Sequence, residues 1–218
     1  MNIFFLSMCY RLAAQMQCDR HVVKMILETA QLLCTAIHLY QLSLDEEDRA
    51  DLEPYGLYKK THQHHPMRKW VSEARANFEW ALNHGLALCD EYTHRYGKVH
   101  KTRALLERLE ADWETLIRWG ECHQTLTIPP ACTSEGHRPA KVLRESRDHE
   151  RVHYYEEQPR PASWEELVAY YRSYYAADKA PLEWFKYGKN REMPEWLEDA
   201  DDGDAMEQPA KRRSVAVD

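Results

Sequence analysis

A row of polar side chains along one predicted helix is the part of this sequence best suited to chemistry. Successive members are three or four residues apart, which places them within one narrow arc of a helix. The row consists of His21, Lys24, Glu28, Gln31, Thr35 and His38. The other side chains between residues 20 and 40 are mostly apolar, a pattern that predicts a buried helix. The row is therefore either the floor of a site or a polar seam that fixes how helices pack.

His21 is the candidate proton carrier of such a site, because an imidazole exchanges a proton near neutral pH. Glu28 or Asp19 would orient it, and His65 is the alternative base. Asp19 is also the expected N-cap of the helix. Lys24 and Glu28 are one helical turn apart, so they can pair and reduce the cost of burying their charges.

Three histidines, His62, His64 and His65, directly precede Pro66 in a basic segment. Pro66 suits the first turn of a helix, whose free N–H groups favour an anion, and His62 is a candidate phosphate contact. The imidazoles could instead ligate zinc, but neither a Cys pair nor a carboxylate stands at supporting spacing. A solvated basic loop is the third alternative. We predict neither a metal ion nor an organic cofactor.

Basic and aromatic side chains gather in the middle of the chain. Residues 58–103 hold nine Lys and Arg against four Asp and Glu. Cations interleaved with aromatic rings suit the phosphates and a stacked base of a nucleic acid. The candidate contacts from this segment are Trp70, Arg95, Tyr96, Lys98 and His100. Two cations of the first predicted helix, Arg20 and Lys24, are candidate contacts as well. Cations also gather at helix C-termini because of the helix dipole, so a purely structural role is the alternative.

Hydrophobic periodicity predicts the helices that would position these side chains. The first spans residues 20–40, the second runs from Pro66 to about Arg95 and ends at Gly97, and the third opens at Thr102. A capping-box spacing at Ser163 begins a fourth, tyrosine-rich helix.

The remaining segments predict little regular structure. Residues 2–6 form the only plausible strand, and the proline-rich, polar residues 125–161 predict an irregular insert. We therefore predict an all-α fold, a single-domain helical bundle over residues 1–197. Residues 198–218 are acidic and have too few apolar side chains to form a core, which predicts a disordered tail.

Composition excludes several classes of protein. The chain has 218 residues, a net charge of −7 and only seven glycines. It contains no glycine-rich dinucleotide or P-loop motif. Its six cysteines include no C-x-x-C pair, which predicts reduced thiols. Uncharged apolar stretches are short and no signal peptide is recognised, so we expect a soluble, intracellular protein without a membrane partner.

Four strings, at residues 18–28, 61–66, 95–100 and 171–175, resemble a helical protein family of tailed phages and large DNA viruses. Most members of that family have no assigned activity. The chain is also similar to the helical, glycosylase-like amino acid:DNA transferases with which phages hypermodify thymine. This resemblance implies double-stranded DNA with a flipped base and a small amino acid or amine as substrates. It also implies a location in the cytoplasm of the infected host cell.

Three functions follow from these observations. The first is a DNA-modifying enzyme that transfers an amino acid amine onto an activated 5-methylpyrimidine. The second is a non-catalytic viral module that binds nucleic acid or a host protein. The third is a metal hydrolase or nuclease built on His62, His64 and His65.

Overall fold

The computed structural model describes residues 1–120, 123–138, 142–148, 151–157, 159–188 and 190–197. The fold is all-α, as predicted. Its α-helices are α1 (Tyr10–Gln15), α2 (Asp19–Leu42), α3 (Pro66–Glu73), α4 (Arg75–Tyr96), α5 (Arg103–Leu116) and α6 (Trp164–Tyr174). A π-helical turn, Tyr175–Lys179, continues α6, and short 3-10 turns span Glu46–Asp48, Glu53–Tyr55 and Glu135–His137. The predicted tail, 198–218, lies outside the described residues.

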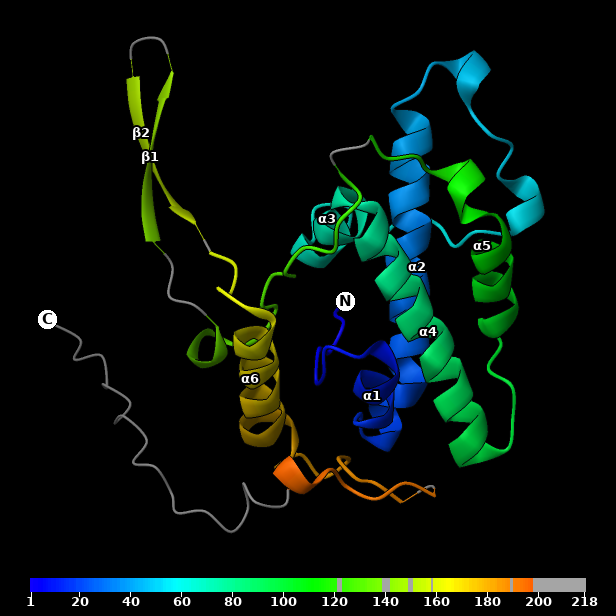
Figure 1. Cartoon of the computed structure of the whole chain (residues 1–218), viewed down its shortest axis with the longest axis vertical. Coiled ribbons are helices and arrows are strands. Elements are labelled where there is room, and N and C mark those ends of the chain that lie inside the picture. The colour runs from blue at the N-terminus through cyan, green and yellow to red at the C-terminus, as the bar shows by residue number, and fades with distance from the viewer. Residues whose placement is uncertain (121–122, 139–141, 149–150, 158, 189, 198–218) are drawn as a thin grey trace, which may run out of the picture.

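The long helix α2 runs through the middle of the bundle, with α3, α4 and α5 packed against it (Figure 1). It is long and apolar enough to cross a membrane, but 61% of that apolar window is buried by the rest of the protein. Such burial is typical of a core helix. The N-cap of α2 is Cys18, whose backbone is extended, and not Asp19 as predicted. Asp19 is the first helical residue, and its carboxylate has other partners, described below.

One predicted helix, 66–95, is in fact two. Pro66 begins α3 and Gly97 ends α4 with a φ of 63°, as the sequence indicated. Between them Ala74 is extended (φ −147°, ψ 151°). The side-chain amide of Asn77 donates to the Trp70 carbonyl oxygen at 2.9 Å, so a carbonyl near the break keeps a partner. Asn77 also bonds Thr127, which anchors the following segment there.

Residues 2–6 form neither a strand nor a helix, and the Leu6 N–H donates to the Phe4 carbonyl oxygen at 3.0 Å, so the predicted strand was wrong. This N-terminal segment lies between α6 and the side of the bundle formed by α1, α2 and α4 (Figure 1). The four consecutive side chains Ile3, Phe4, Phe5 and Leu6 are all buried. Burial without alternation means that the segment is enclosed on every side instead of covering a sheet face. Arg172 of α6 donates to the Leu6 carbonyl oxygen at 3.0 Å.

The insert is more regular than predicted. It contains an antiparallel hairpin of β1 (Val142–Asp148) and β2 (Arg151–Glu157), with Val142 opposite Glu157 and Asp148 opposite Arg151. The helix that follows begins as expected, because the Ser163 hydroxyl accepts from the Glu166 N–H at 3.2 Å. The five cysteines in the described part of the chain are free thiols, in agreement with the sequence.

Candidate functional site

A pocket of about 350 Å³ opens beside the first half of α2. Three parts of the chain line it: the N-terminal segment, α2, and the stretch from the end of α6 to Trp184. Its lining comprises Met1, Asn2, Phe4, Arg20, His21, Lys24, Met25, Glu28, Tyr174, Lys179 and Trp184. The first half of the predicted polar row, from His21 to Glu28, therefore does face a cavity.

The second half of the row is a packing seam. The Thr35 hydroxyl accepts from the Thr61 N–H at 3.2 Å, and a ring nitrogen of His38 bonds the Tyr58 carbonyl oxygen at 3.1 Å. These contacts fasten the loop before α3 onto α2. Each of the two interpretations of the row thus applies to one half of it.

The pocket is electropositive and partly aromatic. Arg20 lies over the Trp184 indole at 4.9 Å, and Lys179 lies over the Tyr174 ring at 4.5 Å. Lys24 is 63% exposed and pairs with Glu28 at 3.1 Å. Glu28 is the only carboxylate in the described lining, against three cationic side chains. The two aromatic rings hold their cations in place by cation–π attraction.

His21 and Phe4 form the wall of the pocket. Their rings are stacked, with centroids 4.5 Å apart and planes 17° apart. Trp184 and His21 lie edge to face with their ring centroids 5.3 Å apart, and Tyr174 lies nearly parallel to Phe4 at 6.4 Å. Phe4 and His21 are only 4% and 6% exposed, so the partly exposed Tyr174 and Trp184 are the rings that offer a planar ligand stacking and edge contacts.

The surroundings of His21 do not suit a proton carrier at neutral pH. Burial, with Lys179, Lys24 and Arg20 nearby, lowers the pKa of His21 to about 3. Its Nδ1 is also already 2.7 Å from the Tyr175 hydroxyl. The role of general base that the sequence suggested for His21 is therefore not supported by its environment.

Neither predicted orienting carboxylate bonds His21 in the described residues. Glu28 accepts from the Asn2 N–H at 2.9 Å with one oxygen and pairs with Lys24 through the other. Asp19 does not line the pocket and belongs to a different cluster.

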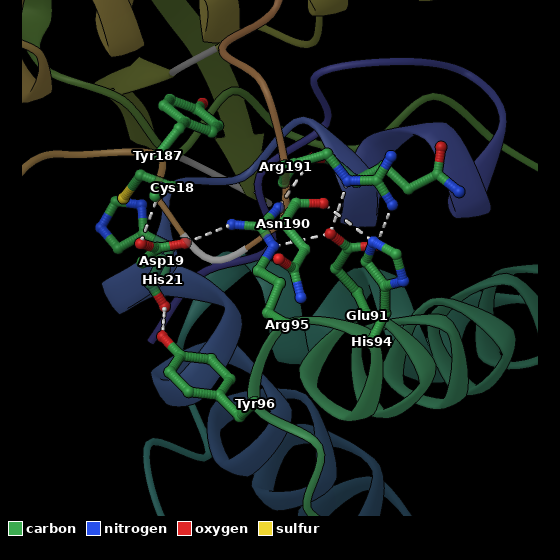
Figure 2. A network of polar contacts seen from close by, with 12 residues as sticks. Cys18, Asp19, His21, Glu91, His94, Arg95, Tyr96, Tyr187, Asn190 and Arg191 are labelled. Atoms are coloured by element: carbon green, nitrogen blue, oxygen red, sulfur yellow. Dashed lines mark hydrogen bonds and ion pairs between the residues drawn. The ribbon is translucent and has the colours of Figure 1, made fainter.

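That cluster is a buried ion network centred on Arg95 (Figure 2). The Arg95 side chain is fully enclosed and donates to Glu91 at 2.6 Å and to Asp19 at 3.0 Å. Arg191 donates to the two Glu91 oxygens at 2.8 and 2.7 Å. Burial raises the pKa of Glu91, but hydrogen bonds from Arg191 and Arg95 outweigh it and lower the pKa below its ordinary value. Arg95 is thus a structural residue with no free donor face for a phosphate, which corrects its predicted role.

The network fastens the C-terminal segment that follows the lining residue Trp184. Asp19 accepts from the Gly188 N–H at 3.1 Å, and its own N–H donates to the Lys186 carbonyl oxygen at 3.0 Å. Tyr96 donates to the Asp19 carbonyl oxygen at 3.2 Å. Asp19 and Tyr96 therefore do not line the pocket; they help to hold the chain that brings Trp184 there.

The other predicted contacts lie elsewhere. Trp70 is fully buried and donates to the Thr127 carbonyl oxygen, so no base can stack on it. His100 accepts from the Thr102 N–H at the start of α5, and the exposed Lys98 lies outside the pocket. The sequence missed Phe4, Tyr174, Lys179 and Trp184 as lining residues, and nothing in their local spacing marks them.

The histidines before α3 do not converge. His65 is the N-cap of α3 and accepts from the Met67 N–H at 3.1 Å, while the exposed His62 bonds the Thr61 hydroxyl. Burial lowers the pKa of His65 below its ordinary value. Within the described ranges no three His, Cys, Asp or Glu side chains are grouped so that they could hold a metal ion.

One cluster contains the serine, histidine and aspartate of a hydrolase triad but lacks free backbone donors for an oxyanion hole. His137 lies 2.8 Å from the Ser173 hydroxyl and 3.5 Å from Asp178. Ser173 is exposed and sits inside α6, where backbone N–H groups are bonded within the helix. An oxyanion hole needs free donors beside the nucleophile. The cluster is better explained as the contact that fastens the Glu135–His137 turn to α6.

Comparison of the chain with protein-family models, with curated proteins and with solved structures finds no match. The case for a function therefore rests on the pocket.

Proposed function

We propose that this protein binds a pyrimidine nucleotide of DNA in the α2 pocket. The observation that carries the proposal is one cavity of about 350 Å³ that combines three cationic side chains with an aromatic wall. Ligand pockets of roughly 300–1,000 Å³ enclose small organic molecules, so one nucleotide is a suitable size. Arg20, Lys24 and Lys179 supply charge-assisted donors for phosphate oxygens. The partly exposed Tyr174 and Trp184 supply the surface for the base, and the buried Phe4 and His21 pack behind them.

The reaction that we propose is amine transfer onto an activated 5-methylpyrimidine, which the resemblance of the sequence suggests. The amine nitrogen attacks the exocyclic methylene carbon, and the new C–N bond forms as the C–O bond to pyrophosphate breaks. Pyrophosphate leaves with the bonding electrons, stabilised by Arg20, Lys24 and Lys179. The nitrogen then loses its extra proton to Glu28, the carboxylate that lines the pocket.

The second candidate is a non-catalytic nucleic-acid-binding module of a virus. The state of His21 favours it, because a neutral imidazole whose Nδ1 is occupied adds no base to the pocket. Both candidates require the same nucleotide contacts and differ only in turnover.

Fluorescence anisotropy with a labelled, thymine-containing duplex tests the binding step. Lys24→Ala should weaken binding about tenfold and reduce the dependence on salt by about one phosphate contact. Lys98→Ala is the matched control, an exposed lysine outside the pocket, and should leave both unchanged. Equal effects of the two variants would place binding on general surface charge and contradict the proposal.

Mass spectrometry of nucleosides tests the reaction. DNA that carries the pyrophosphorylated 5-methylpyrimidine is incubated with the protein and an amino acid, then digested. A nucleoside with the mass of the amine adduct supports the transferase. An unchanged nucleoside profile with intact DNA binding would favour the binding module.

A further inference from the structure

The Tyr175 hydroxyl occupies the inner side of His21. Its oxygen is 2.7 Å from His21 Nδ1 and 2.9 Å from the backbone nitrogen of Cys18. Tyr175 is fully buried, on the π-helical turn that also carries Lys179 into the pocket. The hydroxyl therefore joins the N-terminus of α2 to the pocket wall.

Counting hydrogens assigns the direction of each bond. The Cys18 N–H can only donate, so the Tyr175 oxygen accepts from it. The phenol has one hydrogen of its own, and two acceptors lie within its reach, His21 Nδ1 at 2.7 Å and the Cys18 sulfur. A thiol sulfur is the weaker acceptor, so we assign this hydrogen to Nδ1. A donated O–H requires that Nδ1 carry no proton. In a neutral imidazole the proton is then on Nε2.

The charges around His21 keep its ring neutral. Arg20 and Lys24 face it from α2, Lys179 and the phenol Tyr175 from the π-helical turn, and the thiol Cys18 from the N-cap. Tyr174 and Glu28 share the pocket with it. Burial and the three cations all oppose a second proton on the ring, and burial keeps the Tyr175 phenol protonated by raising its pKa.

We propose that Tyr175 is a positioning residue that fixes His21 as a neutral imidazole with its Nε2–H free for a ligand oxygen in the pocket. Nε2 has no hydrogen-bond partner among the described residues, and His21 lines the cavity. Beside three cations, the acceptor that this N–H suits is a phosphate oxygen. This last step rests on the proposed nucleotide binding; the state of the ring does not.

NMR of the protein labelled with ¹⁵N-histidine tests the ring without any ligand. Long-range ¹H–¹⁵N spectra should show His21 with a protonated Nε2 and a bare Nδ1 from pH 8 to pH 5, with the signal assigned by its absence in His21→Gln. A ring with Nδ1 protonated, or one that titrates near pH 6.5, would overturn the proposal.

Tyr175→Phe removes the hydroxyl and keeps the ring. His21 should then populate both neutral tautomers, and the midpoint of its titration should rise. Tyr171→Phe is the matched control, because this fully buried tyrosine of α6 also makes two hydrogen bonds, to Asn2 and Cys132, and does not bond His21. Equal His21 spectra in the two variants would contradict the role of Tyr175. If Tyr175→Phe does not fold, the wild-type spectra still decide the state of the ring.

Titration with inorganic phosphate and with dTMP tests the ligand contact. His21→Phe keeps a stacking ring without the N–H and should bind both about fivefold more weakly. Unchanged affinity in His21→Phe would refute the contact while nucleotide binding stands. If wild-type protein binds neither ligand, the proposed function fails and the tautomer assignment is judged by NMR alone.

Discussion

Replacing Arg95 with methionine separates a structural arginine from a phosphate-binding one. The variant keeps an apolar side chain of similar length and removes every donor of the guanidinium. In the wild type these donors contact Glu91 at 2.6 Å, Asp19 at 3.0 Å and the Gln15 carbonyl oxygen at 2.9 Å, all within an enclosed side-chain environment.

The loss of stability expected for Arg95→Met depends on the hydrogen bonds that Glu91 and Asp19 keep. Removing one partner of a buried ion pair costs about 3–5 kcal/mol. Here Glu91 keeps its two bonds from Arg191, and Asp19 keeps the Gly188 N–H, so a loss near the lower end, about 3 kcal/mol, is expected for Arg95→Met. Arg191→Met removes a side chain that is 29% exposed and should cost only about 1 kcal/mol.

Urea unfolding followed by circular dichroism measures both losses. With a slope of about 2 kcal/mol per molar urea, the midpoint for Arg95→Met should fall by about 1.5 M. The folded protein should still bind dTMP with wild-type affinity. If Arg95→Met loses less than about 1 kcal/mol of stability but loses dTMP binding, our assignment of Arg95 is wrong.

Two further predictions concern the core. His84 is fully buried, and burial lowers its pKa to about 4, against about 6.5 in the unfolded chain. Between these values only the unfolded chain takes up the proton, so His84 should contribute a fall of about 3 kcal/mol in the free energy of unfolding as the pH drops from 6.5 to 4. His21, whose pKa is about 3, adds to the total fall, so the contribution of His84 is the difference between wild type and His84→Gln in urea titrations. Trp70→Phe loses the hydrogen bond to the Thr127 carbonyl oxygen and part of the packing, so it should reduce the free energy of unfolding by about 2 kcal/mol and lower the thermal midpoint. The dTMP affinity of the folded variant should not change. A reduced affinity would show that Trp70 belongs to the binding site after all.

Local patterns in the sequence were enough for most of the helical fold. The apolar surroundings of the polar row predicted α2, and Pro66, Gly97 and Ser163 marked helix ends through their own backbone or side-chain chemistry. The break at Ala74 could not be predicted in the same way. It depends on the bonds of Asn77 to Trp70 and to Thr127, a residue fifty positions away.

The site was predictable only on the side that α2 contributes. Arg20, His21, Lys24 and Glu28 share the pocket because helical spacing places them on one face. Lys179 reaches it from the far end of the chain, and no local pattern tells which distant segment a helix face will meet. Arg95 was misinterpreted for a related reason. A basic residue near a helix C-terminus looks the same in sequence whether it faces solvent or, as here, the buried Asp19.

Comparing thymidine with dTMP tests most directly whether the α2 pocket holds a phosphate. The ratio of their dissociation constants isolates the phosphate, and it is measured by calorimetry for wild type, Lys24→Ala and Lys98→Ala. We predict that wild type binds dTMP at least about tenfold more tightly than thymidine, that Lys24→Ala removes most of this preference, and that Lys98→Ala keeps it. Equal affinities in the wild type, or a preference lost only in Lys98→Ala, would contradict the account.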